Sequence, residues 1–129
     1  MVCVGVGVRV IIRLMILHIA FDSEWLSAML EGFYRADSLE TEGFIHCSTP
    51  QQVLGPANER FHGQEGLVLL CIDREKVAAP IVYEDCYESG LAFPHIYGPL
   101  NIEAVTTVIA FPPQEDGRFA LPVEFDNVL

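Results

Sequence analysis

Two apolar runs, residues 14–20 and 67–73, constrain the fold of this chain more than any other feature. Each run is seven residues long, which is a usual length for a β-strand, and nearly every position in it is apolar. Such a run is typical of a strand that is buried on both faces. Because the chain has 129 residues, of which 51% are hydrophobic, it is long enough to bury both strands in a single domain.

The residues that follow the first run predict an amphipathic helix at residues 24–31. Asp22 or Ser23 can cap its N-terminus, and Gly32 can end it, since glycine readily adopts the left-handed conformation that closes many helices. Helical spacing then directs three apolar side chains toward the sheet: Trp25, Leu26 and Met29.

Further strands are predicted at residues 81–84, 93–98 and 105–111, where β-branched and aromatic residues lie close to prolines and glycines. Residues 119–122 predict a last strand, which would pair with residues 105–111 in a hairpin. These elements favour an α+β fold: a single small domain with mixed, mostly antiparallel sheets and short helices.

The first fourteen residues are mostly apolar, but Arg9 and Arg13 interrupt them. Each arginine would cost about 3 kcal/mol near the centre of a bilayer, so we predict neither a membrane anchor nor a membrane partner. Met15 opens the first apolar run and is a plausible natural start. We therefore divide the chain into an N-terminal extension (residues 1–14), one globular domain (15–122) and a tail (123–129).

The formal net charge of −11 and the four cysteines limit the partners of the chain. Nucleic-acid binding depends on Lys and Arg that neutralise phosphates, so an acidic chain with seven basic residues is not expected to bind DNA or RNA. The cysteines form no CxxC pair, which favours reduced thiols in the cytoplasm. We expect a cytoplasmic protein whose partner is a small-molecule ligand.

Residues 42–50 form a short apolar strand that carries a histidine and ends in hydroxyl side chains and a proline. Alternation places His46 and Ser48 on the same face of it. His18 and His95 also lie on predicted strands. One such histidine is typical of a core residue with a satisfied hydrogen bond, but three of them favour a shared pocket.

Imidazoles flanked by apolar residues stay neutral near pH 7, the state that suits a general base, and we predict catalytic roles for His18, His46 and His95. A helix that starts at Pro50 after a Thr49 cap would direct backbone donors toward an anion near His46. Four side chains are predicted to bind the ligand: Ser48, Thr49, Glu84 and Tyr97. No metal site is predicted, because no two histidines have the close spacing of common zinc sites.

Several segments of the chain resemble the small bacterial domain-of-unknown-function family 952. The likeness spans residues 17–122, and its two histidine-containing motifs are the most specific part of it. The segments that carry the resemblance are Leu17-His18-Ile19-Ala20, residues 42–49, residues 69–73, residues 93–100 and Phe119-Ala120-Leu121-Pro122.

The chain is also distantly similar to the ADP-ribosyltransferase superfamily, whose NAD-binding cleft lies between two small sheets. The resemblance implies that His18 corresponds to the first-strand histidine, which contacts the ribose and the nicotinamide amide. His46 corresponds to the stacking position on the next motif strand. The match departs at the third position, where His95 and Tyr97 stand in place of the expected catalytic glutamate.

These observations lead to one function hypothesis and two alternatives. The first is an ADP-ribosyltransferase-like fold that binds NAD or a related nucleotide as a substrate, with no other cofactor. The second is a non-catalytic module that binds a small anionic metabolite. The third is a metal-dependent hydrolase that uses the three histidines. The sequence specifies neither the substrate nor the oligomeric state.

Overall fold

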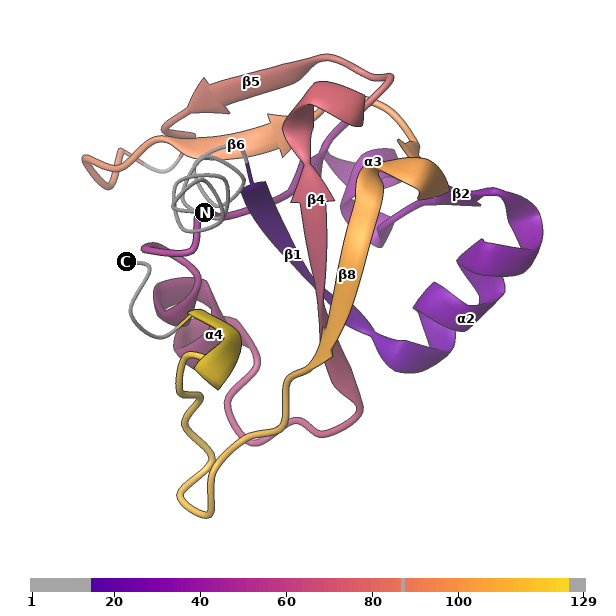
Figure 1. Ribbon diagram of the computed structural model, residues 1–129. Helices are drawn as coiled ribbons and strands as arrows, with labels where there is room; N and C mark the ends of the chain where they lie inside the picture. The colour runs from indigo at the N-terminus through magenta and orange to yellow at the C-terminus, as the bar shows by residue number, and fades with distance from the viewer. Residues whose placement is uncertain (1–14, 87, 126–129) are drawn as a thin grey trace, which may run out of the picture.

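The computed structural model describes residues 15–86 and 88–125 (Figure 1). The predicted extension at residues 1–14 therefore lies outside the described residues, as do the last four residues of the predicted tail. Within the described part, the chain forms a small α+β domain with antiparallel sheets and short helices.

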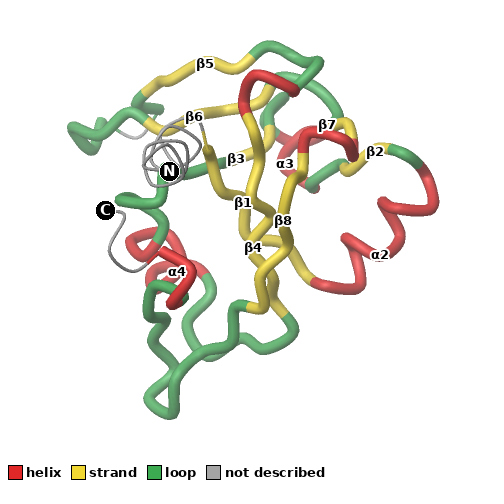
Figure 2. The backbone as a smooth tube through the Cα atoms, viewed as in Figure 1, coloured by secondary structure: helices red, strands yellow, loops and turns green. Residues whose placement is uncertain are grey.

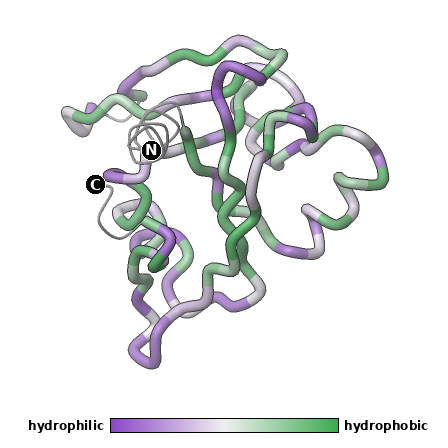
Figure 3. The backbone as a smooth tube through the Cα atoms, viewed as in Figure 1, coloured by the Kyte–Doolittle hydropathy of each residue, from purple (hydrophilic) through white to green (hydrophobic). Residues whose placement is uncertain are grey.

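The two long apolar runs form strands, as predicted, and the structure places these strands side by side in one sheet. Strand β1 (Met15–Phe21) and strand β8 (Val105–Ala110) lie on either side of β4 (Leu67–Asp73), and both pair with it antiparallel. Alternate residues of β1 and β4 point to opposite faces, so their uninterrupted apolar sequences supply a core on each face. Figure 3 shows these strands as the most hydrophobic continuous part of the chain.

The core on one face contains Trp25, Tyr34, Ile45, Ile96 and Leu100, packed against Ile16, Ala20, Leu70 and Ile72 of the sheet. The other face carries a second core, which consists of Leu17, Leu69 and Cys71 of the sheet and of Val53, Ala57, Phe111, Phe119 and Phe125. The sheet is thus covered on both sides.

A second sheet crosses near one end of the first (Figure 1). It has the order β3-β6-β5, with β3 at Ile45–His46, β6 at Phe93–Ile96 and β5 at Ile81–Glu84, and its pairs are antiparallel. A bridge between Leu17 and Ser48 joins β1 to the segment after β3. The predicted strand at residues 42–50 is thus two short pairings with different sheets.

Short elements connect the two sheets (Figure 2). Strands β2 (Phe33–Tyr34) and β7 (Leu100–Asn101) pair with each other, and helix α3 (Asp37–Thr41) leads into β3. Three single-turn 3₁₀ helices complete the set: η1 (Arg74–Lys76), η2 (Ile102–Ala104) and η3 (Val123–Phe125).

Helix α2 (Asp22–Glu31) lies beside the first sheet and ends as predicted, with Gly32 in the left-handed conformation at φ 93°. Trp25 is buried, but Met29 and Leu26 are about half exposed, so the prediction that all three face the sheet was wrong. Ala28 occupies the buried position instead. A small side chain there lets the helix approach the sheet closely, and the larger side chains remain outside.

Helix α4 covers Leu54–Arg60, so the prediction that a helix starts at Pro50 was wrong. Pro50 lies in a turn, and the side chain of Thr49 makes no capping bond. The turn is closed instead by the backbone N–H of Gln52, which donates to the carbonyl of Thr49 at 3.0 Å. The predicted anion site at the start of that helix is therefore absent.

The predicted hairpin of residues 105–111 with residues 119–122 was also wrong. Residues 119–122 form no strand, and β8 pairs with β4. Pro112 and Pro113 after β8, and Pro122 at the end of the predicted strand, lack the backbone donors that strand pairing needs. Phe119 is held by a different contact, since its ring stacks on Phe111 with centroids 4.7 Å apart.

The chain remains packed beyond Pro122, because Phe125 in η3 is buried in the second core. Among the described residues, no helix combines the length and the apolar character that a membrane crossing would need.

Candidate functional site

A cavity of about 750 Å³ lies between the β1 edge of the first sheet, the second sheet and α4. Its size falls within the usual range of small-molecule sites. His18, His46 and His95 all line it, although they come from three strands far apart in the sequence. It is the natural candidate for a functional site.

The register of the second sheet brings two of these histidines together. His46 of β3 lies directly opposite His95 of β6, and their ring centroids are 5.3 Å apart. Phe44 stacks on the His95 ring at 4.0 Å and lies nearly parallel to it. The aromatic contact fixes the plane of the His95 imidazole, which is only 2% exposed.

Glu84 of β5 reaches His95 across the same sheet. Val82 is opposite His95, so Glu84, two residues further on, is a diagonal neighbour on the same face. Its Oε1 lies 2.8 Å from Nδ1 of His95. A carboxylate can only accept, so Nδ1 carries a proton, and in the neutral tautomer of the ring the lone pair is on Nε2.

The Nε2 atom of His95 remains open to the cavity. No described residue bonds to it, and no buried side-chain nitrogen or oxygen in the described part of the chain lacks a hydrogen-bond partner. The atom therefore keeps access to solvent. An imidazole that is oriented by a carboxylate and presents an unprotonated nitrogen has the arrangement of a general base.

Tyr97 shares a face with His95 on the sheet and donates its hydroxyl proton to the same Oε1 of Glu84. Hydrogen bonds from Tyr97 and His95 hold the pKa of the Glu84 carboxyl below its usual value. The bond to Glu84 raises the pKa of Tyr97 to about 12. Glu84 is therefore ionised at neutral pH, and Tyr97 is protonated.

His18 makes two bonds within the protein. Its Nδ1 donates to the carbonyl of His46 at 2.5 Å, and its Nε2 accepts from the hydroxyl of Tyr34 at 2.9 Å. Burial lowers the pKa of His18 to about 4, so the ring is neutral. His18 ties β1 to β3 beneath the other two histidines, and both of its ring nitrogens are engaged.

His46 also has a carboxylate partner. Its Nε2 lies 2.9 Å from Oε2 of Glu42, four residues earlier in the chain. The His46 side chain is 22% exposed and the Glu42 side chain 42% exposed, so this pair lies nearer the surface than His95. It forms a second carboxylate–histidine pair at the rim of the site.

The two predicted hydroxyl ligands differ in position. Ser48 is buried and lines the cavity, while its backbone pairs with Leu17 at 2.7 and 2.8 Å. Thr49 does not line the cavity, and its backbone amide donates to the side chain of Gln52 at 3.0 Å. Tyr97 likewise lies outside the lining and reaches the site only through Glu84.

The charge of the lining is mostly negative. Four carboxylates line the cavity, and Arg60 is the single Lys or Arg among the described residues that do so. Among the described residues, neither Lys nor Arg forms an ion pair with Glu84. The carboxylates of the lining are Glu24, Asp37, Glu59 and Glu84. Such a cavity favours a ligand with a positive charge near Glu84.

Two cysteines line the cavity in different environments. Cys47 is buried, and burial raises the pKa of its thiol well above the usual value. Cys86 is exposed, and its Sγ lies 3.9 Å from Nδ1 of His95. Partial desolvation and the charge of Glu84 raise the pKa of the Cys86 thiol. Neither sulfur is therefore an activated nucleophile.

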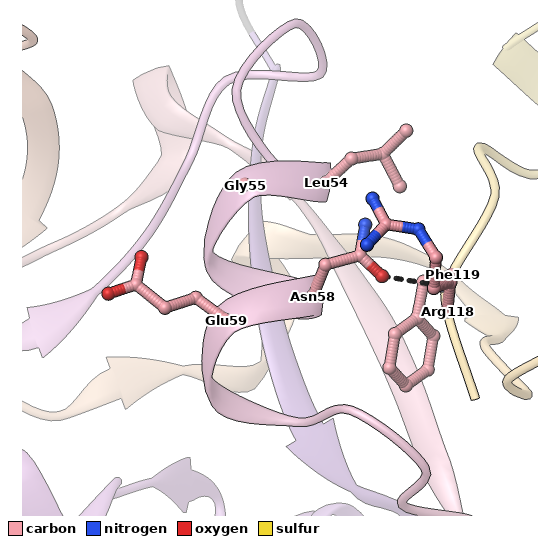
Figure 4. Close-up of a pocket in the computed structure, with 6 residues that line it drawn as sticks. All are labelled: Leu54, Gly55, Asn58, Glu59, Arg118 and Phe119. Carbon is pink, nitrogen blue, oxygen red and sulfur yellow. Dashed lines mark hydrogen bonds between the residues drawn. The ribbon is translucent and has the colours of Figure 1, made fainter. Parts of the chain in front are cut away.

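A second pocket, of about 520 Å³, lies between α4 and residues 118–119 (Figure 4). Asn58 accepts a hydrogen bond from the backbone of Phe119 at 2.7 Å, which ties the helix to the C-terminal loop. Arg118 and Glu59 carry the charges of this pocket, but Glu59 extends away from Arg118 (Figure 4). The two charged groups do not converge, so this pocket is a poor candidate for a catalytic site.

A family model described as "Protein of unknown function (DUF952)" matches residues 19–108 of the chain. The chain is a member of the DUF952 family. The matched segment contains His46 and His95, and His18 lies one residue before it.

Solved structures have a similar fold. Crystal structures of protein CC0527 from Caulobacter crescentus, including one of a double mutant, share 30% sequence identity with this DUF952 chain and have a TM-score of 0.75. They cover 83% of this chain and 94% of that one. The solution structure of CC0527 has 28% identity and a TM-score of 0.73, and covers 89% and 98% of the two chains. No curated protein matches this DUF952 chain.

Sequence patterns identified most of this DUF952 site but missed two of its side chains. No sequence pattern singles out Tyr34, yet its hydroxyl bonds to His18. Glu42 precedes His46 by four residues in a turn, and no strand or helix rule connects them. The pairing of Glu84 with His95 depends on sheet register, which the sequence does not specify.

Proposed function

We propose that this DUF952 domain is an enzyme that binds NAD⁺ in the histidine cavity and cleaves the bond between the ribose and nicotinamide, in the manner of an ADP-ribosyltransferase. The observation that carries the proposal is the Glu84–His95 pair, which presents an unprotonated Nε2 to a cavity of ligand size. The acceptor of the ADP-ribosyl group is water or a hydroxyl group.

The charge of the cavity supports a cationic reacting group. The nicotinamide ring of NAD⁺ is positively charged, and cleavage of its glycosidic bond passes through a transition state with positive charge on the ribose. Glu84 has no Lys or Arg partner among the described residues, so its charge is available to stabilise both species. Arg60 lines the same cavity and is suited to the pyrophosphate.

The reaction balances with the groups present. The C1′–N bond breaks, its electron pair leaves with nicotinamide, and the ring becomes neutral. An oxygen of water or of an acceptor hydroxyl forms the new bond to C1′. Its proton passes to Nε2 of His95, and the carboxylate of Glu84 stabilises the resulting imidazolium through Nδ1.

Glu84 also bears on the catalytic glutamate that the superfamily pattern expects and this sequence lacks at the third position. The ADP-ribosyltransferase superfamily resemblance has His95 and Tyr97 where a catalytic glutamate is expected. In the structure both side chains bond to Oε1 of Glu84, so a carboxylate is present beside that position, contributed by the neighbouring strand. We assign the ligand-facing roles to His46 and His95, and a positioning role to His18, whose nitrogens are both engaged.

The proposal is tested by calorimetric titration with NAD⁺, ADP-ribose and nicotinamide in a buffer that contains a metal chelator, and by chromatographic measurement of nicotinamide release. We expect saturable NAD⁺ binding and slow release of nicotinamide. Substitution Glu84→Gln keeps the shape of the side chain but removes its charge, so we expect binding to weaken and release to fall at least tenfold.

The matched controls are Glu65→Gln, which changes an exposed glutamate in a loop away from the cavity, and His62→Gln, which changes an exposed histidine. Both controls should behave like the wild type. Absence of binding at millimolar NAD⁺ would rule out the proposed substrate. Equal turnover in the Glu84→Gln and Glu65→Gln proteins would rule out the proposed chemistry.

A further inference from the structure

A third side chain stands beside the Glu84–His95 pair. Cys86 lies two residues after Glu84, and its Sγ, the Oε1 of Glu84 and the Nδ1 of His95 all lie within 4.8 Å of one another. The closest pair, Oε1 and Nδ1, is 2.8 Å apart, and Sγ lies 3.9 Å from Nδ1. The three residues offer one oxygen, one sulfur and one nitrogen ligand atom.

The sulfur–nitrogen distance suits a tetrahedral zinc ion, and the 2.8 Å between Oε1 and Nδ1 would open to about 3.3 Å when zinc replaces the shared proton. With a Zn–S bond of about 2.3 Å and a Zn–N bond of about 2.0 Å, sulfur and nitrogen in such a site lie about 3.6 Å apart. The observed separation of 3.9 Å is close to this value. Three protein ligands from Cys, His and Glu leave a fourth position for water, as in catalytic zinc sites.

The charges and the local backbone also fit a cation. A thiolate and a carboxylate together balance the charge of Zn²⁺, and His95 is a neutral ligand. Glu84 has no Lys or Arg partner among the described residues. The loop that carries Cys86 is held in place by Asp85, whose carboxylate accepts from the backbone of Ser89 at 2.8 Å and of Gly90 at 2.7 Å.

We infer that Glu84, Cys86 and His95 form a zinc site, and that zinc bound there prevents the reaction proposed above. The second part rests on the proposed function and follows from the histidine tautomer. Zinc bound to Nδ1 replaces the proton that Nδ1 donates to Glu84, so the proton of the neutral ring moves to Nε2. The ring nitrogen that faces the cavity then donates instead of accepting. The carboxylate of Glu84 is also occupied.

The site is tested with Co²⁺, which replaces zinc and gives a near-ultraviolet charge-transfer band when a thiolate binds it. The protein carries Cys3→Ser, since Cys3 lies outside the described residues. We expect the band to saturate at one equivalent, to disappear in Cys86→Ser, and to persist in the control His62→Gln. Zinc affinity, measured by competition with a chelating dye, should fall at least tenfold in Cys86→Ser.

Cys86 is exposed, so its substitution leaves the core intact. Absence of the band in the starting protein, or an unchanged band in Cys86→Ser, would overturn the zinc site whatever the outcome with NAD⁺.

The second part is tested by NAD⁺ titration of the zinc-loaded and the chelator-treated protein. We expect binding only after zinc removal. Equal NAD⁺ binding in both states overturns the competition and leaves the proposed function standing. Absence of NAD⁺ binding in both states removes the proposed function, and with it the competition, while the cobalt band alone decides the zinc site.

Discussion

Mild acid should destabilise this protein through His18. The ring is buried, donates from Nδ1 to the carbonyl of His46 and accepts at Nε2 from Tyr34. Protonation would convert Nε2 into a donor facing the Tyr34 hydroxyl and would place a charge in the core, so the folded state resists it. Burial accordingly lowers the pKa of His18 from 6.5 to about 4.

The sign and the size of the effect follow from linkage. Because the pKa is lower in the folded state, the unfolded chain binds more protons between about pH 6.5 and pH 4, and the free energy of unfolding falls as the pH falls through this window. From these two pKa values, the loss from His18 alone between pH 7 and pH 5 is about 2 kcal/mol.

Urea unfolding at pH 7 and pH 5 measures this loss, and the variant His18→Asn isolates it. Asparagine does not titrate, and its side-chain amide can still donate to the carbonyl of His46. The variant is expected to be less stable at both pH values but to lose about 2 kcal/mol less than the wild type between them. The same loss in both proteins would refute the assignment of a buried neutral His18.

Two further predictions concern packing and thiol exposure. Gly98→Ala would place a Cβ atom 2.8 Å from the Cβ of Ala79, so we expect it to destabilise the protein by roughly 1–3 kcal/mol in urea unfolding. Gly55→Ala would meet no atom within 4 Å apart from its chain neighbours and the backbone of its own helix, so its loss should be smaller and confined to the contact with Pro56. A larger loss for Gly55→Ala than for Gly98→Ala would contradict this packing. Among the described cysteines, the exposed Cys86 should react with iodoacetamide in the folded protein, and the buried Cys71 should react only after denaturation. Mass spectrometry of the peptides measures both reactions. Labelling of Cys71 under native conditions would mean that the second core opens.

The sequence predicted the parts of the fold that depend on burial alone. The apolar runs that became β1 and β4 have the length and composition typical of strands buried on both faces, and the structure contains them as neighbours. The helix before Gly32 was also predicted, because a glycine that ends a helix marks the boundary locally.

Errors arose where a local rule competed with tertiary contacts. The pair Thr49-Pro50 suits a helix start, but the side chain of Gln52 donates to the distant carbonyl of Ala92 at 2.8 Å, and the segment forms a turn. Residues 119–122 have the composition of a strand, yet the partner strand β8 is already paired with β4, and Phe119 packs on Phe111 instead. Neither contact is visible in local sequence.

In the candidate site, too, local sequence patterns predicted one part and tertiary contacts decided the other. Residue type and alternation predicted which histidines to examine, but the register of the second sheet decides their partners. His46 meets His95, and Glu84 reaches His95, only because β3, β6 and β5 pair as they do. A shift of one residue in β5 would move Glu84 to the other face and leave the imidazole without its carboxylate.

The most direct test of the proposed site is a nitrogen-15 NMR spectrum of the histidine rings during titration with NAD⁺, in the presence of a metal chelator. Before NAD⁺ is added, we expect His95 to be protonated at Nδ1 and to have an unprotonated Nε2. On addition, the Nε2 signal of His95 should move, while that of the exposed His62 should not. If Nε2 of His95 carries the proton in the free protein, or if its signal is unchanged at millimolar NAD⁺, the cavity does not hold the general base described here.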